Sequence, residues 1–517
     1  MDENRIVAHP VRPLRLVSVV FFGILAIALA VLISRLELKF QVTAIVAVVG
    51  TVGLLALRGP ARIRYVMVAA LAFGLSVGID KSFFHHYFVA GSYVRWVQGA
   101  AAITVTLSLL GALGYSAVSL GETWFFGRHR HFLIERSLVV AAASFMAVGI
   151  LSLANAHDVW LVLLEEIRLS TLLFISIVVM NFSRRELRFF FRCIAISVLL
   201  QAGLAAIQYT TGKTLGLAVA GEEKLVAERV AYATVFRVTG TVGHSNILAY
   251  FFEITVPLML ALAFVVKSRF DRGLFFTAMV SGVGGMVLTM SRGAWMSLPL
   301  TVAFILYMVP GRRLLTLKAS VIGILLLILL AAASVFFMPI IAERLLGDDA
   351  GSSSHRIPLD LSALSVIARF PIVGVGLNNF AVSFHYYDTI GNSRVFFDID
   401  HVVHNLFLLV LGDVGVLGLL AFSWYFVSAF RVAGKIVHNG DPWSRAAALG
   451  LVTGLCAHLL HGMVDPGFKL SLTISQLIAA SIGAVGCLAL HPRDASDDGR
   501  KRLQYGFRLG LRPRITR

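Results

Sequence analysis

Long apolar runs separated by short polar segments recur along most of the chain. Each run is about 16 to 25 residues long, the length that an α-helix needs to cross a bilayer. Strands of a β-barrel would alternate lipid-facing and lumen-facing residues over about ten positions. The pattern therefore predicts an all-α polytopic membrane protein with twelve to fourteen transmembrane helices. The candidate runs are 16–34, 40–57, 65–79, 96–118, 138–153, 160–180, 189–210, 247–266, 274–290, 294–309, 314–341, 404–430, 445–461 and 469–490.

The composition supports this interpretation and argues against a bound cofactor. Of the 517 residues, 58% are hydrophobic and 14% are charged, a balance that excludes a soluble globular domain of this length. The three cysteines lie inside apolar runs without metal-ligand spacing. The run Gly212-Lys213-Thr214 resembles the end of a phosphate-binding loop, but Ile207 stands where that loop needs glycine. We expect neither a metal nor another cofactor.

The charge distribution predicts the orientation of the spans. The chain has 45 Lys and Arg against 28 Asp and Glu, a formal net charge of +17. In membrane proteins the cytoplasmic loops collect Lys and Arg. With the N-terminus placed inside, most basic residues fall on the inner segments, for example Arg58, Arg184, Lys267 and Arg431. This distribution predicts both termini in the cytoplasm, contact with membrane lipid, and no nucleic-acid partner.

Two long outer segments, 211–246 and 342–403, break the regular alternation of spans. Long ordered loops in compact proteins usually carry function. We therefore divide the chain into N-terminal transmembrane helices (1–210), a central region (211–430), C-terminal transmembrane helices (431–490) and a basic cytoplasmic tail (491–517). The central region contains the large outer loop 342–403, between the eleventh and twelfth predicted helices.

Charged residues inside the predicted spans are costly unless they are paired or face a cavity. Glu165 and Arg168 lie three positions apart on one helix, a spacing that brings their side chains together. Both a structural ion pair and the lining of a substrate cavity remain open for them. The acids near the outer span ends, Glu253, Asp413 and Asp465, are expected to serve helix packing or capping. His458 and His461 lie on one face of a predicted span and are expected to form a satisfied polar core.

Basic groups also gather where predicted spans reach the outer face. Arg237 opens a polar run that leads to Asn246, Arg292 occupies a tight outer turn after Ser291, and His404 begins the twelfth span. Each arginine alone is explained by a side chain that extends to the interface. Together these residues predict an electropositive outer cavity with one group able to take a proton, which suits a lipid-phosphate substrate and acid–base chemistry.

Three stretches resemble the O-antigen ligase superfamily, which includes O-antigen ligases, Wzy-type polymerases and bacterial protein O-oligosaccharyltransferases. The first is Arg237-x-x-Gly240 followed by Gly243-His-Ser-Asn246, and the second is the turn Thr289-Met-Ser-Arg-Gly293. The third runs from Gly374-Val-Gly-Leu-Asn-Asn-Phe380 through His404-Asn405 to Gly415-Val-Leu-Gly418. The matching region covers roughly residues 235 to 425.

The resemblance implies a glycosyltransferase of the bacterial inner membrane that works at the periplasmic face without a metal or a nucleotide. Its donor would be an undecaprenyl-pyrophosphate-linked glycan, and its acceptor a hydroxyl of lipid A core or of a growing glycan. In this interpretation Arg237 and Arg292 hold the pyrophosphate, and His404 activates or orients the acceptor hydroxyl. Asn246, Asn405 and Ser291 would support substrate binding by hydrogen bonds.

The sequence leaves the member of the superfamily open. The ligase-associated Arg-x-x-x-Leu pattern is absent from the large outer loop, where Arg356 and three other arginines either bind acceptor phosphates or are solvated. The histidine motif favours a ligase over a Wzy-type polymerase of O-antigen or exopolysaccharide repeat units. A polytopic transporter or lipid-linked oligosaccharide flippase is a further alternative, because Gly282, Gly284 and Gly285 would permit a broken helix.

Overall fold

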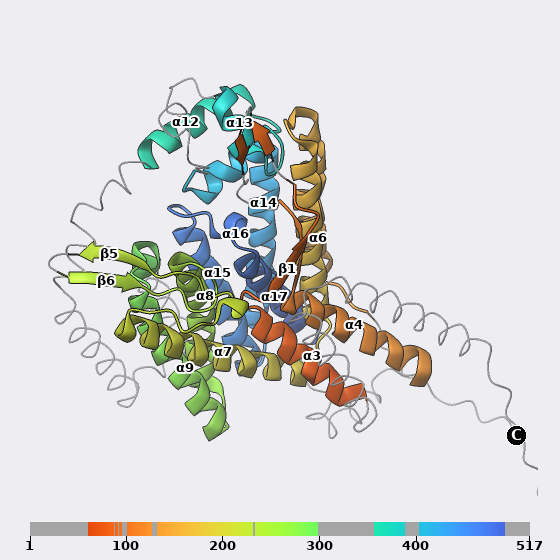
Figure 1. The fold of residues 1–517 in the computed structure, drawn as a ribbon. Helices are drawn as coiled ribbons and strands as arrows, with labels where there is room; N and C mark the ends of the chain where they lie inside the picture. Colours follow the sequence, from red (N-terminus) through yellow and green to blue (C-terminus); the bar gives the residue numbers. More distant parts are fainter. Residues whose placement is uncertain are drawn as a thin grey trace, which may run out of the picture. The chain divides into compact units, whose positions relative to one another are not determined.

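The computed structural model describes residues 60–86, 88–90, 93–95, 101–126, 132–230, 233–297, 356–387 and 403–491. In this part of the chain long helices dominate, and the strands form antiparallel two-stranded hairpins (Figure 1). The strands are β1 (Asp80–Phe83), β2 (Phe88–Ala90), β3 (Tyr93–Arg95), β4 (Ile103–Thr106), β5 (Val226–Val230) and β6 (Ala233–Arg237). They pair as β1 with β4, β2 with β3, and β5 with β6.

Most of the described helices correspond to predicted apolar runs. The described helices are α3 (Pro60–Gly74), α4 (Leu107–Phe126), α5 (Arg136–Leu151), α6 (Val159–Met180), α7 (Arg184–Thr211), α8 (Ser245–Val265), α9 (Arg269–Leu288), α12 (Arg356–Arg369), α13 (Phe380–Tyr387), α14 (Leu406–Asn439), α15 (Pro442–His461), α16 (Gly467–Leu470) and α17 (Leu472–Leu490). Of these, α12, α13 and α16 do not correspond to a predicted run. Short 3₁₀ turns lie at Ser152–Asn155 and Ala218–Ala220.

Six described helices are long and apolar enough to cross a membrane: Arg136–Asn155, Arg184–Thr211, Ser245–Val265, Leu406–Asn439, Pro442–His461 and Leu472–Leu490. They confirm the predicted all-α polytopic membrane fold. Four predicted spans, at 16–34, 40–57, 294–309 and 314–341, lie wholly or mostly outside the described residues. The total of twelve to fourteen spans therefore stays a prediction.

One predicted span differs from the structure, and the predicted outer loop contains helices of its own. The expected span 96–118 contains strand β4, and helix begins only at Leu107, because β-branched residues at 103–106 pair with β1. The outer loop 342–403 contains two helices, α12 and α13, which bury Leu359, Ala363 and Phe380 in a small hydrophobic cluster. Residues 96–118 are predicted as a span from their apolar content alone, but the pairing of β4 with β1 makes residues 103–106 a strand.

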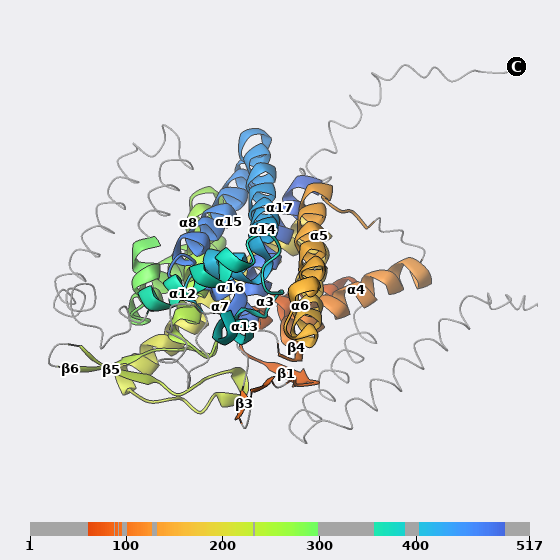
Figure 2. The same cartoon turned by 90° about the horizontal axis from the view of Figure 1, so that it is seen from above.

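The described chain divides into two units. The smaller comprises Met1–Met67 with Leu113–His131, and within it Arg64 forms a buried ion pair with Glu122. The larger comprises Val68–Ala112 with Phe132–Arg517 and contains the residues discussed below. In the larger unit α8 packs against α9 and α15, α6 packs against α17, and α5 packs against α14 (Figures 1 and 2).

Local sequence signals fix where several of these helices begin. Ser183 and Glu186 form a capping box at the start of α7, in which each side chain bonds the other's backbone. Asp441 caps α15 by accepting hydrogen bonds from the backbone of Trp443 and Ser444. These caps satisfy backbone N–H groups that a helix cannot satisfy internally.

Candidate functional site

Four helix ends converge in the larger unit and bring the motifs of the sequence together. The start of α14 is bonded to the end of α15, since Leu406 N donates to Gly462 O at 2.7 Å. The start of α8 is bonded to the segment that follows α15, through Asn246 and Asp465. The end of α9 is bonded to the last residue of β6, through Thr289 and Arg237.

Arg237 is fixed by two groups from different motifs. Its Nη2 donates to Asn246 Oδ1 at 2.6 Å, and its Nε donates to the Thr289 carbonyl at 3.3 Å. Asn246 Nδ2 in turn donates to Asp465 Oδ2 at 2.5 Å. The guanidinium is planar, so two bonds to groups on separate elements hold its plane in one orientation and restrict the rotamer of Arg237. Asn246 thus positions Arg237 and links it to a carboxylate.

The turn after Arg237 is held by two glutamines of α7. Gln208 Oε1 accepts from the backbone N–H of Thr239 and Gly240 at 3.1 and 2.9 Å, and Gln201 Oε1 accepts from Thr241 N at 3.1 Å. All these groups are buried, so each bond satisfies a polar atom that would otherwise be costly. Gly240 has φ 55° and fits this left-handed turn without strain.

A buried chain of polar side chains lies beneath the Ser291–Arg292 turn. Glu253 Oε2 lies 2.9 Å from His461 Nδ1, and His461 Nε2 lies 3.5 Å from Ser291 Oγ. The ring of Tyr250 stacks on His461 with centroids 4.1 Å apart. A carboxylate at Nδ1 favours the proton on that nitrogen and leaves Nε2 to accept from the serine hydroxyl. This acid–histidine–serine chain fixes the backbone on which Arg292 is carried.

Gly293 closes that turn over the histidine. A Cβ placed on Gly293 would lie 2.9 Å from Cγ of His461 and closer still to Cδ2 and Nε2. Only glycine allows the backbone to approach the ring this closely. Each residue of this turn has its own role. Ser291 contacts His461, Arg292 carries a half-buried guanidinium, and Gly293 lets the backbone approach the histidine ring.

His404 and Asn405 stand at the start of α14. Asn405 Oδ1 accepts from the backbone of Phe407 and Leu408 at 2.9 and 3.1 Å, so it caps the helix. Burial lowers the pKa of His244, and electrostatic interactions with Arg237 and His404 lower it further, whereas Asp465 acts in the opposite direction. The bond from Leu406 N to Gly462 O joins the start of α14, just after His404, to the end of α15 beside His461.

The Gly374–Phe380 motif packs into a break of α14. Gly415 has φ 66° and ψ −169°, which interrupts the helix there. The freed carbonyls of Gly412 and Asp413 accept from Val375 N at 3.0 Å and Gly376 N at 2.9 Å. The glycines near 374 and those near 415, about forty residues apart in the sequence, therefore form one structural unit. This unit determines where α14 is interrupted after His404.

The structure brings most of the predicted site residues to one place. Arg237, Asn246, Ser291 and His404 belong to the linked set of helix ends, and Arg292 and Asn405 are their direct neighbours in the chain. Arg356 is different: it begins α12, and its side chain lies outside the described residues. The catalytic and substrate-binding roles of these residues stay predictions.

Several polar residues expected in helix packing or in a polar core have specific partners. Glu253 and His461 pair with each other, Asp413 pairs with Lys469, and Asp465 bonds Asn246. Sequence reasoning missed Lys469, because a lysine at the first position of a predicted span resembles an interfacial anchor. Its signal was the preceding Pro466-Gly467, which marks a turn and not a helix interior.

Within the described residues, no group of three or more His, Cys, Asp or Glu side chains is arranged to hold a metal ion. The basic groups at the convergent helix ends instead suit an oxyanion, because guanidinium groups match phosphate oxygens in charge and geometry.

Comparisons with known proteins agree with the motifs. Residues 277–423 match a family model described as O-antigen ligase, which confirms the resemblance for that part of the chain. The matched range includes Ser291, Arg292, His404 and Asn405. No curated protein matches the chain. A solved structure from "Structural coordination of polymerization and crosslinking by a peptidoglycan synthase complex" is similar, with a TM-score of 0.42 and 14% identity over 70% of this chain and 100% of that chain.

Proposed function

We propose that this membrane protein transfers a glycan from undecaprenyl pyrophosphate to an acceptor hydroxyl, because residues 277–423 match the O-antigen ligase family. The family match supports a glycan-transferring membrane enzyme of the ligase and polymerase type. The observation that carries the proposal is the convergence of Arg237, the Ser291–Arg292 turn and the start of α14, which follows His404, at linked helix ends. We propose that these ends face the periplasm of a bacterial inner membrane, with both termini in the cytoplasm.

The arrangement supports a direct displacement. The acceptor oxygen attacks the anomeric carbon of the donor sugar, and the bond from that carbon to the pyrophosphate oxygen breaks. The bonding pair leaves with the pyrophosphate, whose growing negative charge Arg237 and Arg292 stabilise. His404 takes the proton of the acceptor hydroxyl. A single displacement inverts the configuration at the anomeric carbon.

We assign the acceptor narrowly to lipid A core, as in an O-antigen ligase, and keep a Wzy-type polymerase as the second candidate. Both reactions use the same donor chemistry, and they differ only in the hydroxyl that is delivered. The His404-Asn405 motif favours the ligase. Arg356, at the start of the loop helix α12, is proposed to contact the acceptor.

A transporter or flippase receives less support. The glycines that would permit a broken helix lie in α9, which runs without interruption from Arg269 to Leu288. A Cβ on Gly282 would meet Val256 and Val198, and one on Gly285 would meet Phe252, so both glycines serve close helix packing. The basic groups of the proposed site lie at helix ends, whereas transporter sites usually lie near the bilayer midplane.

Deletion of the gene in its own host tests the proposal. A ligase deletion should leave core-only lipopolysaccharide and accumulate long lipid-linked chains. A polymerase deletion should instead leave core bearing a single repeat, or remove a secreted polymer. Unchanged lipopolysaccharide, secreted polysaccharide and lipid-linked glycan would reject the proposed function.

Orientation needs its own measurement. Single cysteines introduced beside Arg237 and His404 should react with a membrane-impermeant maleimide in intact spheroplasts. Protection of both positions, with labelling restored only after lysis, would overturn the periplasmic assignment.

A further inference from the structure

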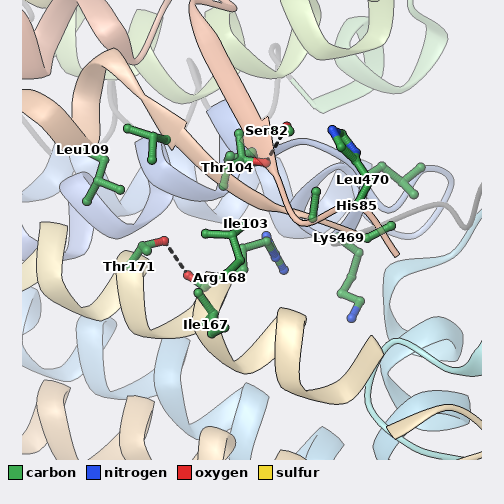
Figure 3. A pocket seen from close by; sticks show the side chains of 14 residues that line it. Ser82, His85, Ile103, Thr104, Leu109, Ile167, Arg168, Thr171, Lys469 and Leu470 are labelled. Carbon is green, nitrogen blue, oxygen red and sulfur yellow. Dashed lines mark hydrogen bonds between the residues drawn. The ribbon is translucent and has the colours of Figure 1, made fainter. Parts of the chain in front are cut away.

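A cavity of about 280 Å³ lies between the β1–β4 hairpin, α6 and the α16–α17 junction. Figure 3 shows the side chains of Arg168, Lys469 and His85 around it, with Ser82 and Thr104 on the hairpin side. None of the residues proposed above for pyrophosphate or proton transfer lines this cavity. It is therefore a second candidate site, separate from the convergent helix ends.

Two of the lining residues, Arg168 and Lys469, belong to a buried cluster of four charged side chains. Arg168 forms a two-pronged bond to Glu165, with Nε to Oε2 at 2.7 Å and Nη2 to Oε1 at 2.6 Å. Lys469 Nζ lies 3.0 Å from both Glu165 Oε1 and Asp413 Oδ2. All four groups are at least nine-tenths buried, so the cluster is an ordered element that joins α6, α14 and α16. Glu165 and Arg168 thus form the predicted ion pair, and Arg168 also lines this cavity; that the cavity receives substrate stays a prediction.

The cluster leaves hydrogen-bond donors for the cavity. A guanidinium has five N–H groups, and the bonds of Arg168 to Glu165, Phe468 O and Ser475 Oγ engage four of them. An ammonium has three, and Glu165 and Asp413 engage at most two of those on Lys469. Both residues line the cavity, whereas their carboxylate partners do not. The cavity wall therefore presents fixed donors.

The charge balance and the remaining walls narrow the class of ligand. Two cations face two carboxylates, so the cluster supplies donors without a net positive charge. A phosphate would gain little there, whereas the hydroxyl and ring oxygens of a sugar would find donors in these N–H groups. Ser82 and Thr104 bond each other at 2.9 Å and Thr171 donates to Arg168 O at 2.7 Å, so their hydroxyl oxygens remain as acceptors for sugar hydroxyls. Apolar side chains, including Ile103 and Ile167, offer flat contact to the C–H face of a sugar ring.

We propose that this cavity binds one neutral or N-acetylated sugar residue of the glycan substrate, held by Lys469, Arg168 and the neighbouring hydroxyls. The inference rests on the proposed glycan transfer and adds to it a sugar subsite apart from the pyrophosphate site. At about 280 Å³ the cavity lies just below the about 300–1,000 Å³ typical of ligand pockets, a size that suits a single sugar residue and not a chain.

The test uses the full-length protein in lipid nanodiscs free of glycoside detergents. Saturation-transfer NMR is recorded with methyl glucoside and N-acetylglucosamine at millimolar concentration. Ala102→Leu fills the cavity without removing a polar group, and Ala143→Leu on the exposed face of α5 is the matched control. We expect signal from at least one sugar with the wild type and with Ala143→Leu, and its loss with Ala102→Leu.

A second variant keeps the test decisive if Ala102→Leu fails to fold. Thr171→Val preserves the volume of the cavity wall and removes one hydroxyl, so sugar affinity should fall about twofold to tenfold. Sugar signal that persists in a folded Ala102→Leu protein, an unchanged affinity in Thr171→Val, displacement of sugar by inorganic pyrophosphate, or no signal from either sugar would each overturn the proposal. Sugar binding without glycan transfer in membranes would reject the proposed function alone, and transfer without sugar binding would reject the subsite alone.

Discussion

Replacing Gly293 by alanine should damage the position of Arg292 more than the fold. The added Cβ would lie 2.9 Å from Cγ of His461, at least about 0.5 Å inside the 3.4 Å at which ordinary contact begins. The ring cannot easily retreat, because Glu253 holds its Nδ1 at 2.9 Å and Tyr250 stacks on its face. Because the overlap with Cδ2 and Nε2 of His461 is larger still, the turn that carries Arg292 must move by about 1 Å.

The size of both effects follows from this overlap. Overpacking of a buried contact costs about 1–3 kcal/mol of stability. A displacement of about 1 Å at a group that positions substrate costs about a hundredfold in rate, so Gly293→Ala should lower turnover about tenfold to a hundredfold. Most of that loss should appear in kcat, because the substitution disturbs the contact of Arg292 with the leaving pyrophosphate, which strengthens in the transition state.

Gly284→Ala is the matched control for this substitution. Gly284 lies on α9 with open space where a methyl group would be added, so alanine there should raise stability by about 0.5–1 kcal/mol and leave turnover unchanged. Thermal unfolding of the purified variants and glycan transfer in isolated membranes are the two assays. Wild-type turnover in a folded Gly293→Ala protein would refute the link between His461 and the position of Arg292.

Three further substitutions test the proposed site and the fold. Arg292→Lys should lose at least about tenfold in transfer although it keeps the charge, because a point ammonium cannot reproduce the two-pronged contact to phosphate; full activity in a membrane assay would contradict the phosphate role. His404→Ala should reduce turnover about a hundredfold to ten-thousandfold at normal protein levels, and an unchanged rate across pH would exclude acid–base catalysis by this residue. Although burial raises the pKa of Asp441, hydrogen bonds from Arg184 and Ser444 and the positive charge of Arg184 lower it overall. Its ionised form therefore stabilises the fold above its ordinary pKa, and the benefit is lost as pH falls through the lowered value. Asparagine still caps the helix, so Asp441→Asn should have a lower free energy of unfolding than the wild type at neutral pH, and this difference should shrink in acid. A difference independent of pH would refute a stabilising role for the charge of Asp441.

The sequence alone determined that this is a helical membrane protein, and it located several of the spanning helices and the segments that carry the motifs. Apolar runs of bilayer length specify spanning helices locally, because a chain in lipid must satisfy its backbone hydrogen bonds within each segment. The ranges 189–210, 247–266, 445–461 and 469–490 accordingly correspond to α7, α8, α15 and α17. The motifs around Arg237, Arg292 and His404 were also visible, since basic groups at span ends stand out against apolar surroundings.

The tertiary structure alone decided which polar groups meet. Asn246 binds Arg237 and Asp465, and His461 binds Glu253, across more than 200 residues of sequence in two of these three pairs. Lys469 resembled an interfacial residue until α16 placed it between Glu165 and Asp413. Hydropathy and spacing report on one segment at a time, whereas the partner of a buried polar group is set by how separate helices pack.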